Sequence, residues 1–181
     1  MKVMHKYVAA SLLGAAAAAV VFSMGSCVSI PKGAKAVQPF QKDKFFGTWY
    51  EIARFDFKFE RGLSQVSATY SEKDANTIRV DNKGYDYTKN EWKESIGKAK
   101  FVKIPTLGRL KVSFFGPFYA GYNVIAVDDN YQYALIAGNN LNYLWILSRK
   151  KTIPESIKND YLSKAKDLGY DIKKLIWTKQ D

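Results

Sequence analysis

Apolar and polar residues alternate along short stretches of the chain between residues 46 and 149, and turn-forming residues separate these stretches. A period of two is typical of β-strands with one buried face, and connections this short favour antiparallel hairpins. Strands are predicted at residues 46–54, 65–71, 77–87, 92–104, 109–115, 119–127, 131–137 and 142–149, with a bulge at Lys83 and Gly84.

Consecutive hairpin-linked strands leave two exposed sheet edges unless the sheet closes on itself. The predicted fold class is therefore all-β, an eight-stranded antiparallel up-and-down β-barrel. A barrel of this size has an interior large enough for side chains or for one small ligand. Small residues such as Ala53 and Ala68 recur among the large ones, so the interior need not be filled.

The pattern changes after Lys151, where an amphipathic helix is predicted. Residues 152–155, Thr-Ile-Pro-Glu, have the sequence of a capping box with proline in the first helical turn, and Gly169 ends the helix. Its apolar stripe consists of Ile157, Tyr161, Ala165 and Leu168. We expect this one C-terminal α-helix to pack outside the barrel, followed by a short strand at 175–177.

The N-terminus has the features of an export signal. Lys2 and Lys6 precede an uninterrupted run of apolar and small residues at 8–22, which is short for a membrane span. Residues 28–44 lack periodicity and are rich in turn formers and lysine. The chain is therefore divided into a signal peptide at 1–26, an N-terminal tether at 27–44 and a single domain at 45–181.

Cys27 is the only cysteine, so no disulfide can form within the chain. Residues 24–27, Met-Gly-Ser-Cys, resemble the lipobox of bacterial lipoproteins, with methionine at the position where leucine is usual. That resemblance implies that Cys27 is the first mature residue and carries a lipid, which would anchor the domain to a membrane. The alternative is a chance cysteine just after a signal sequence.

The formal net charge is +11, a value that raises the question of nucleic-acid binding. The lysines are spread along the whole chain rather than clustered, and an exported protein does not meet the usual nucleic-acid targets. We therefore expect no nucleic-acid partner, and we interpret the charge as a solvated surface near an anionic membrane.

The first strand combines a glycine with a tryptophan two residues later. Gly47 allows a backbone or a large ring to approach closely, and Trp49 is placed to close one end of a barrel. Strand alternation from Trp49 sends Glu51, Ala53 and Phe55 to the same face, which would be mostly apolar with one carboxylate. An ordinary core strand containing tryptophan would show the same pattern.

Three ordered sequence blocks resemble the signatures of the lipocalin family: Gly-Thr-Trp-Tyr at 47–50, Tyr-Asn-Val-Ile-Ala-Val-Asp at 122–128 and Leu-Ser-Arg at 147–149. Longer runs are similar to its bacterial outer-membrane, apolipoprotein D-like branch, at 47–55, 59–62, 111–119 and 143–149. Residues 127–129, Val-Asp-Asp, depart from the Thr-Asp-Tyr of the second block, so no role is assigned to them.

The resemblance implies a role for each end of the barrel. Gly47, Trp49 and Arg149 form the structural signature, with Arg149 packed across Trp49 at the closed end, an arrangement that cation–π attraction favours. The family pattern directs five predicted ligand-binding residues into the cavity: Val66, Ala68, Tyr70, Asn123 and Ile125. Alternation from Trp49 and from Arg149 adds four more: Ala53, Phe55, Tyr143 and Trp145. Val127 and Leu147 should also point inward. Such an apolar, aromatic pocket suits the acyl chain of a fatty acid or lysophospholipid, although each residue could equally be core packing.

Charged residues in the loops after strands define a possible rim at the open mouth. Lys58 and Arg61 follow the first strand, which begins at the closed end and therefore finishes at the open one, and Lys89 lies in another such loop. A positive rim would attract a phosphate or carboxylate head group. Solvated loop charge is the simpler interpretation.

Two classes of function are compatible with this sequence. The first is a membrane-anchored lipid carrier at the cell outer membrane, on its periplasmic face, that stores, transports or repairs envelope lipids. The second is an enzyme acting on a bound lipid or isoprenoid. We predict no catalytic residue, metal or cofactor, because the only histidine, His5, is lost with the signal peptide and no metal-ligand cluster is evident. Exposed aromatic residues at 114–119 would permit a homodimer.

Overall fold

The computed structural model describes residues 28–181; the predicted signal peptide at 1–26 and Cys27 lie outside the described residues. The described elements are, in chain order, α1 (Lys42–Phe45), β1 (Gly47–Phe55), β2 (Leu63–Asp74), β3 (Thr77–Asp86), β4 (Glu91–Phe101), β5 (Arg109–Ser113), β6 (Ala120–Val127), β7 (Tyr133–Ala137), β8 (Leu144–Ser148), α2 (Glu155–Asp167), a short 3-10 helix (Ile172–Lys174) and β9 (Leu175–Trp177).

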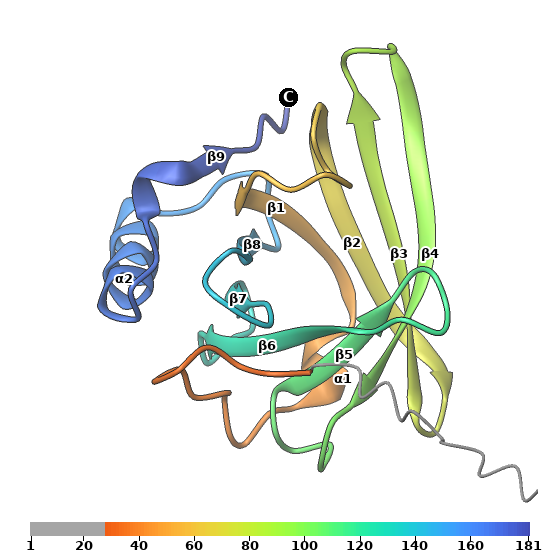
Figure 1. Ribbon diagram of the computed structural model, residues 1–181, viewed down its shortest axis with the longest axis vertical. Coiled ribbons are helices and arrows are strands. Elements are labelled where there is room, and N and C mark those ends of the chain that lie inside the picture. Colours follow the sequence, from red (N-terminus) through yellow and green to blue (C-terminus); the bar gives the residue numbers. More distant parts are fainter. Residues whose placement is uncertain (1–27) are drawn as a thin grey trace, which may run out of the picture.

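The sheet closes into a barrel, as the hairpin pattern predicted. Strands β2 to β8 are neighbours in sequence order, and β1 pairs with both β8 and β2, so no edge remains open along its first half. All these pairings are antiparallel. The short strand β9 adds to the end of β1, where β1 has left β2 (Figure 1). The eight-stranded up-and-down barrel is therefore confirmed.

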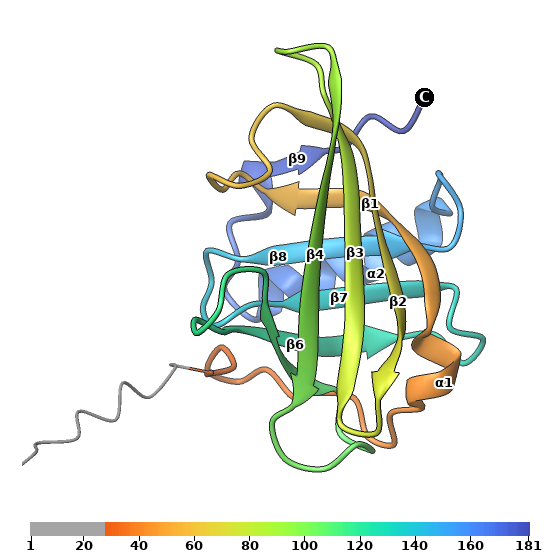
Figure 2. The same ribbon diagram turned by 90° about the vertical axis from the view of Figure 1, so that its right-hand side faces the viewer.

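The long strands β2, β3 and β4 cross the direction of β6, β7 and β8 at a steep angle (Figure 2). Pairing between β3 and β4 is continuous, so the bulge predicted at Lys83 and Gly84 is wrong. The bulge lies instead on the neighbouring strand β2, which has one extra residue between Ser64 and Ser67. Gln65 in this stretch has a φ of 49°. Gly84 faces this irregularity, and a Cβ there would lie 3.2 Å from Leu63, so the glycine accommodates the bulge of its partner.

Two apolar cores lie on the two sides of the barrel wall. The inner core fills the closed end and includes Phe45, Trp49, Tyr70, Val124 and Leu147. The outer core lies between the wall and the C-terminal elements and includes Ile52, Ala53, Phe55, Tyr161 and Ala165.

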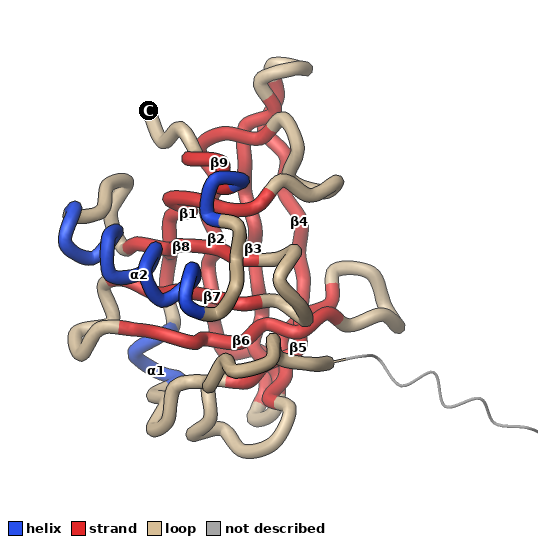
Figure 3. The backbone as a smooth tube through the Cα atoms, turned by 60° about the vertical axis from the view of Figure 1, so that its left-hand side comes forward, coloured by secondary structure: helices blue, strands red, loops and turns tan. Residues whose placement is uncertain are grey.

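Helix α2 packs on the outside of the barrel, as predicted (Figure 3). Tyr161 and Ala165 are buried against the wall, and the Tyr161 hydroxyl donates a hydrogen bond to the carbonyl of Tyr133. The predicted capping box is wrong, because Pro154 occupies the N-cap position in an extended conformation and no side chain caps the helix. The helices in the part of the chain from residue 28 onward are too short or too polar to cross a membrane.

The segment before α1, which belongs to the tether predicted at 27–44, lies against the barrel. Val37 exchanges backbone hydrogen bonds with β6 and the β4–β5 loop, donating to Val124 and accepting from Gly108. Phe40 is buried in the inner core. The loop after β4, which ends at Phe101 rather than near 104, bonds to this segment through Thr106, whose carbonyl accepts from Phe40.

Candidate functional site

The closed end of the barrel is held together by Arg149 and Trp49. The guanidinium carbon lies 3.9 Å from the centroid of the Trp49 ring, so the predicted stacking is present. Arg149 also donates hydrogen bonds at 2.8 Å to the carbonyls of Lys44, Thr48 and Phe46. Gly47 has a φ of +96°, and a Cβ there would lie 3.2 Å from the guanidinium. This glycine therefore leaves room for the arginine.

A cavity of about 700 Å³ occupies the other half of the barrel. Its volume lies in the range of small-molecule sites. The wall is mainly apolar and aromatic, and the lining includes Trp49, Val66, Ala68, Tyr70, Val80, Val112, Phe114, Tyr122, Tyr143, Trp145 and Leu147. Five of the nine residues predicted to bind ligand are thus brought together here: Val66, Ala68, Tyr70, Tyr143 and Trp145.

Ala53 and Phe55 do not line this cavity, so their predicted inward facing is wrong. Glu51 pairs with Leu147 on β8, and Ala53 pairs with the adjacent residue Ile146. Ile52 is therefore an extra residue in β1, a β-bulge. A bulge of this kind reverses the facing of every residue after it. Ala53 and Phe55 consequently lie in the outer core, whereas Glu51, before the bulge, lines the cavity as alternation predicted.

A second bulge explains the two errors in β6. Val124 and Ala126 pair with two adjacent residues of β7, Ile136 and Leu135. Ile125 is therefore the extra residue, and it packs with the outer core. Val127, beyond the bulge, does pack with the inner core as predicted. The family pattern also directed Asn123 inward, but Asn123 lies before the bulge, and its side-chain amide instead donates to the carbonyls of Ala137 and Gly138. The inward-facing residues are Tyr122 and Val124.

The inner end of the cavity is closed by a pair of tyrosines. The hydroxyls of Tyr70 and Tyr122 lie 2.7 Å apart, in hydrogen-bond contact. Burial raises the pKa of both phenols, so both are neutral at physiological pH. The floor therefore offers one polar contact without a charge.

A polar cluster interrupts the apolar wall near the open end. The Arg54 guanidinium, 2% exposed, donates to the Glu51 carboxylate at 2.8 Å and lies 3.6 Å from the carboxylate of Glu60. The Trp145 indole N–H donates to Glu60 at 3.2 Å. Burial first, and then the neighbouring Glu51 carboxylate, raise the pKa of Glu60 well above its ordinary value. Sequence reasoning missed this cluster because the bulge at Ile52 turns Arg54 inward.

The C-terminal residues complete the wall where β1 and β2 separate. Thr178 donates its hydroxyl to Glu51 at 2.5 Å, and the Gln180 amide donates to the carbonyls of Glu51 and Val66 at 2.6 and 2.9 Å. The backbone N–H of Gln65 donates to the Lys179 carbonyl at 2.6 Å. The C-terminal residues thus bridge β1 and β2, which do not hydrogen-bond to each other at this point.

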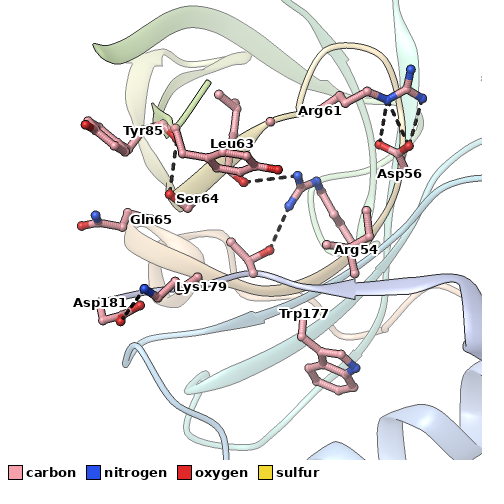
Figure 4. Close-up of a pocket in the computed structure, with 14 residues that line it drawn as sticks. Arg54, Asp56, Arg61, Leu63, Ser64, Gln65, Tyr85, Trp177, Lys179 and Asp181 are labelled. Atoms are coloured by element: carbon pink, nitrogen blue, oxygen red, sulfur yellow. Dashed lines mark hydrogen bonds and ion pairs between the residues drawn. The ribbon is translucent and has the colours of Figure 1, made fainter. Parts of the chain in front are cut away.

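The predicted rim residues are not equivalent. Lys58 lines the cavity. Arg61 lines instead a second hollow of about 520 Å³ between the start of β2 and the C-terminal residues, and Arg54 lines this hollow too. There its guanidinium pairs with Asp56 at 2.9 Å (Figure 4). Lys89 lies in the loop between β3 and β4 and is not among the residues that line either space.

The site offers hydrophobic contact with a few polar anchors rather than reactive groups. From residue 28 to residue 181, no group of three or more His, Cys, Asp or Glu side chains is arranged to hold a metal ion. The carboxylates of Glu51 and Glu60 both pair with Arg54, and Glu60 also accepts from Trp145. Such an arrangement can enclose an apolar molecule and orient one polar end.

Comparison with known families and proteins gives a consistent result. The family model described as a lipocalin-like domain matches residues 40–180. The outer membrane lipoprotein Blc of Escherichia coli (strain K12) is 49% identical over 169 residues, which cover 93% of this chain and 96% of that protein. The protein of the same name from Vibrio cholerae is 46% identical, with 87% and 92% covered. Apolipoprotein D of Macaca fascicularis is 33% identical, with 88% and 85% covered.

Solved structures with much lower sequence identity share the fold. Insecticyanin from the tobacco hornworm Manduca sexta superposes with a TM-score of 0.69 at 22% identity, covering 83% of this chain and 86% of that one. Lobster apocrustacyanin A1 superposes with a TM-score of 0.67 at 16% identity, covering 85% and 92%. These likenesses concern the barrel and not its ligand.

Proposed function

This chain belongs to the lipocalin family, and on that premise we propose that it is a membrane-anchored protein that holds one fatty acid or lysophospholipid in its barrel. The alternative of an enzyme acting on a bound lipid is not retained, because the chain belongs to the lipocalin family and the wall of its cavity is mainly apolar.

The observation that carries this proposal is the cavity of about 700 Å³ with its apolar and aromatic wall. An acyl chain gains about 0.8 kcal/mol for each methylene that leaves water, so it is the part of a lysolipid that the apolar wall favours. The Tyr70–Tyr122 floor and the Glu51–Arg54–Glu60 cluster add few polar contacts, so the tail takes the depth of the barrel and the head group remains near the mouth.

We place the protein at the outer membrane through a lipid on Cys27, after removal of a signal peptide at 1–26. Support comes from the lipobox-like sequence at 24–27 and from relatives named outer membrane lipoproteins. On the periplasmic face, a carrier of single-chain lipids would serve the storage, transport or repair of envelope lipids.

The test is organic extraction of the protein purified from membranes, followed by mass spectrometry of the extracted lipids. We expect single-chain lipids in amounts approaching one per protein, and the intact mass of the protein should include an acylated Cys27. A matched extraction of Ala68→Trp, which adds a large ring to the lining of the cavity, should yield much less. Equal lipid in both preparations would mean that the lipid does not occupy the barrel.

A further inference from the structure

The loops around the cavity mouth expose three phenylalanines. Phe59, Phe115 and Phe118 are 73%, 66% and 70% exposed. They lie in the β1–β2 and β5–β6 loops, and both loops line the cavity entrance. The rings of Phe59 and Phe115 are 6.1 Å apart, so the two loops form one apolar surface. Large apolar side chains grouped at the surface of a soluble domain mark a contact site.

The first described residues are fixed beside this mouth. Ser29 donates its hydroxyl to the carbonyl of Asn139 at 2.7 Å, and its own carbonyl accepts from Asn123 at 3.1 Å. The Arg109 guanidinium donates to the carbonyl of Val28 at 3.1 Å. Asn139 itself lines the cavity. Figure 2 shows this start of the described chain on the same side of the barrel as the β1–β2, β5–β6 and β7–β8 loops.

This placement constrains where an anchored lipid can lie. Cys27 directly precedes Val28 in the sequence, and consecutive Cα atoms are about 3.8 Å apart. The N-terminal segment from Val28 to Phe40 is bonded to the barrel and is not a free spacer. A lipid on Cys27 therefore enters the bilayer next to the mouth rather than at a distance from the domain.

Cationic side chains accompany the apolar surface. Lys58 is exposed in the same loop as Phe59. The ammonium groups of Lys111 and Lys98 lie 4.9 and 5.8 Å from the ring centroid of Tyr119, which belongs to the β5–β6 loop. Aromatic residues flanked by lysines are suited to the interface of an anionic bilayer, where the rings enter the head-group region and the ammonium groups meet phosphate.

From these observations we propose that the mouth of the barrel docks on the bilayer that holds the anchor, with Phe59, Phe115 and Phe118 inserted among the lipid head groups. This inference rests on the proposed function, because it takes Cys27 as the anchored residue. A bilayer is favoured over a second copy of the chain as the occupant, since the anchor brings lipid to this surface in every single molecule. A lipid could then pass between membrane and cavity without crossing water.

The test places a fluorescent label at the mouth of the full-length, membrane-extracted protein. Phe118→Cys introduces a thiol at the mouth, and Ile104→Cys introduces one in the β4–β5 loop at the closed end, where Ile104 is 50% exposed. A lipid attached through the sulfur of Cys27 leaves no competing thiol. Each labelled protein is reconstituted into vesicles of phosphatidylethanolamine and phosphatidylglycerol containing a nitroxide-bearing lipid that quenches only nearby fluorophores.

We expect most of the fluorescence to be lost at position 118 and little at position 104. Phe59→Cys, labelled in the same way, should also be quenched, and adding Phe115→Ser and Phe118→Ser should reduce that quenching. The matched pair Ile96→Ser and Ile104→Ser, exposed apolar residues away from the mouth, should leave it unchanged.

Three results would overturn the proposal, and each can be distinguished from the result expected if Cys27 carries no lipid. Equal quenching at positions 118 and 104 would mean that the mouth is not oriented toward lipid. If the protein co-floats with the vesicles but neither position is quenched, the mouth again does not contact the bilayer. Thiol cross-linking of two chains through position 118 that persists on vesicles at high dilution would assign the surface to a second copy. Labelling of the unsubstituted chain at Cys27 would instead contradict the proposed lipid anchor.

Discussion

Removal of the Arg149 guanidinium should destabilise the closed end of the barrel by an amount that the structure allows to be worked out. The substitution Arg149→Met keeps an unbranched stem of similar length over Trp49 and deletes the charge. Hydrogen bonds from a charged donor contribute about 1.5–3 kcal/mol each when buried. Of the four carbonyls that Arg149 contacts, those of Phe46 and Tyr131 are reached in partly buried surroundings, so about 3 kcal/mol is assigned to these two.

The remaining contributions are smaller. The stack on Trp49 at 3.9 Å adds about 1 kcal/mol, and the two more exposed bonds, to Lys44 and Thr48, add a few tenths each. Arginine and methionine lose a similar amount of side-chain entropy when they are immobilised, about 1.5–2 kcal/mol, so this cost does not enter the difference. The net loss for Arg149→Met is therefore about 4 kcal/mol, which for a domain of this size lowers the melting temperature by roughly 8–16 °C.

Urea unfolding followed by circular dichroism measures this loss, with Arg149→Lys as the matched control. Lysine keeps a cation near the ring but lacks the planar fork that reaches several carbonyls at once, so an intermediate loss is expected. If Arg149→Met changes the free energy of unfolding by less than about 1 kcal/mol, the hydrogen bonds of Arg149 do not hold the closed end and the reasoning above is refuted.

Three further predictions concern the cavity. Lys58→Glu should weaken binding of an anionic lysolipid more than binding of a neutral monoglyceride in a fluorescent-lipid displacement assay, whereas Arg61→Glu, at a residue paired with Asp56 outside the cavity, should change neither. Ala68→Trp should abolish displaceable lipid binding while calorimetry shows a folded barrel, and undiminished binding would place the ligand elsewhere. The pKa of Glu60 is raised in the folded state, so the folded protein retains a proton that the unfolded chain releases. The free energy of unfolding should therefore fall as pH rises above about 4.3 and through the folded pKa. Glu60→Gln should reduce this fall in urea unfolding measured at several pH values, and an unchanged pH profile would contradict the prediction.

The sequence was sufficient to predict the barrel because its hydrophobic alternation extends over many short strands with turn residues between them. The closed end was also predictable, since Trp49 and Arg149 lie in family-specific blocks and their stacking needs only that both face inward. The helix position followed from a stripe with a period near 3.6 residues, and its buried members Tyr161 and Ala165 are those of the stripe.

The ligand site was predicted only in part, and the errors have a common cause. Alternation is a reliable guide along an unbroken strand, and the predicted residues on β2 and β8 indeed line the cavity. A bulge adds one residue without any fixed sequence signal, and here the extra residues are Ile52 and Ile125, β-branched residues that fit a regular strand equally well. The packing of the N-terminal segment was missed for a different reason: it is held by backbone bonds and by Phe40 rather than by any periodic pattern.

The bulge at Ile52 also gives the cavity its polar cluster. Without the extra residue, Arg54 would face the outer core, where burial beneath apolar side chains would leave its charge without a partner. With it, Arg54 turns inward between Glu51 and Glu60, and Ala53 and Phe55 turn outward to pack with the C-terminal elements. The extra residue therefore has two effects. It lets Ala53 and Phe55 pack with the C-terminal elements, and it pairs Arg54 with Glu60, the carboxylate that accepts from Trp145. The departure from regular alternation thus lies where the wall combines apolar contact on one side with an ion-paired charge on the other.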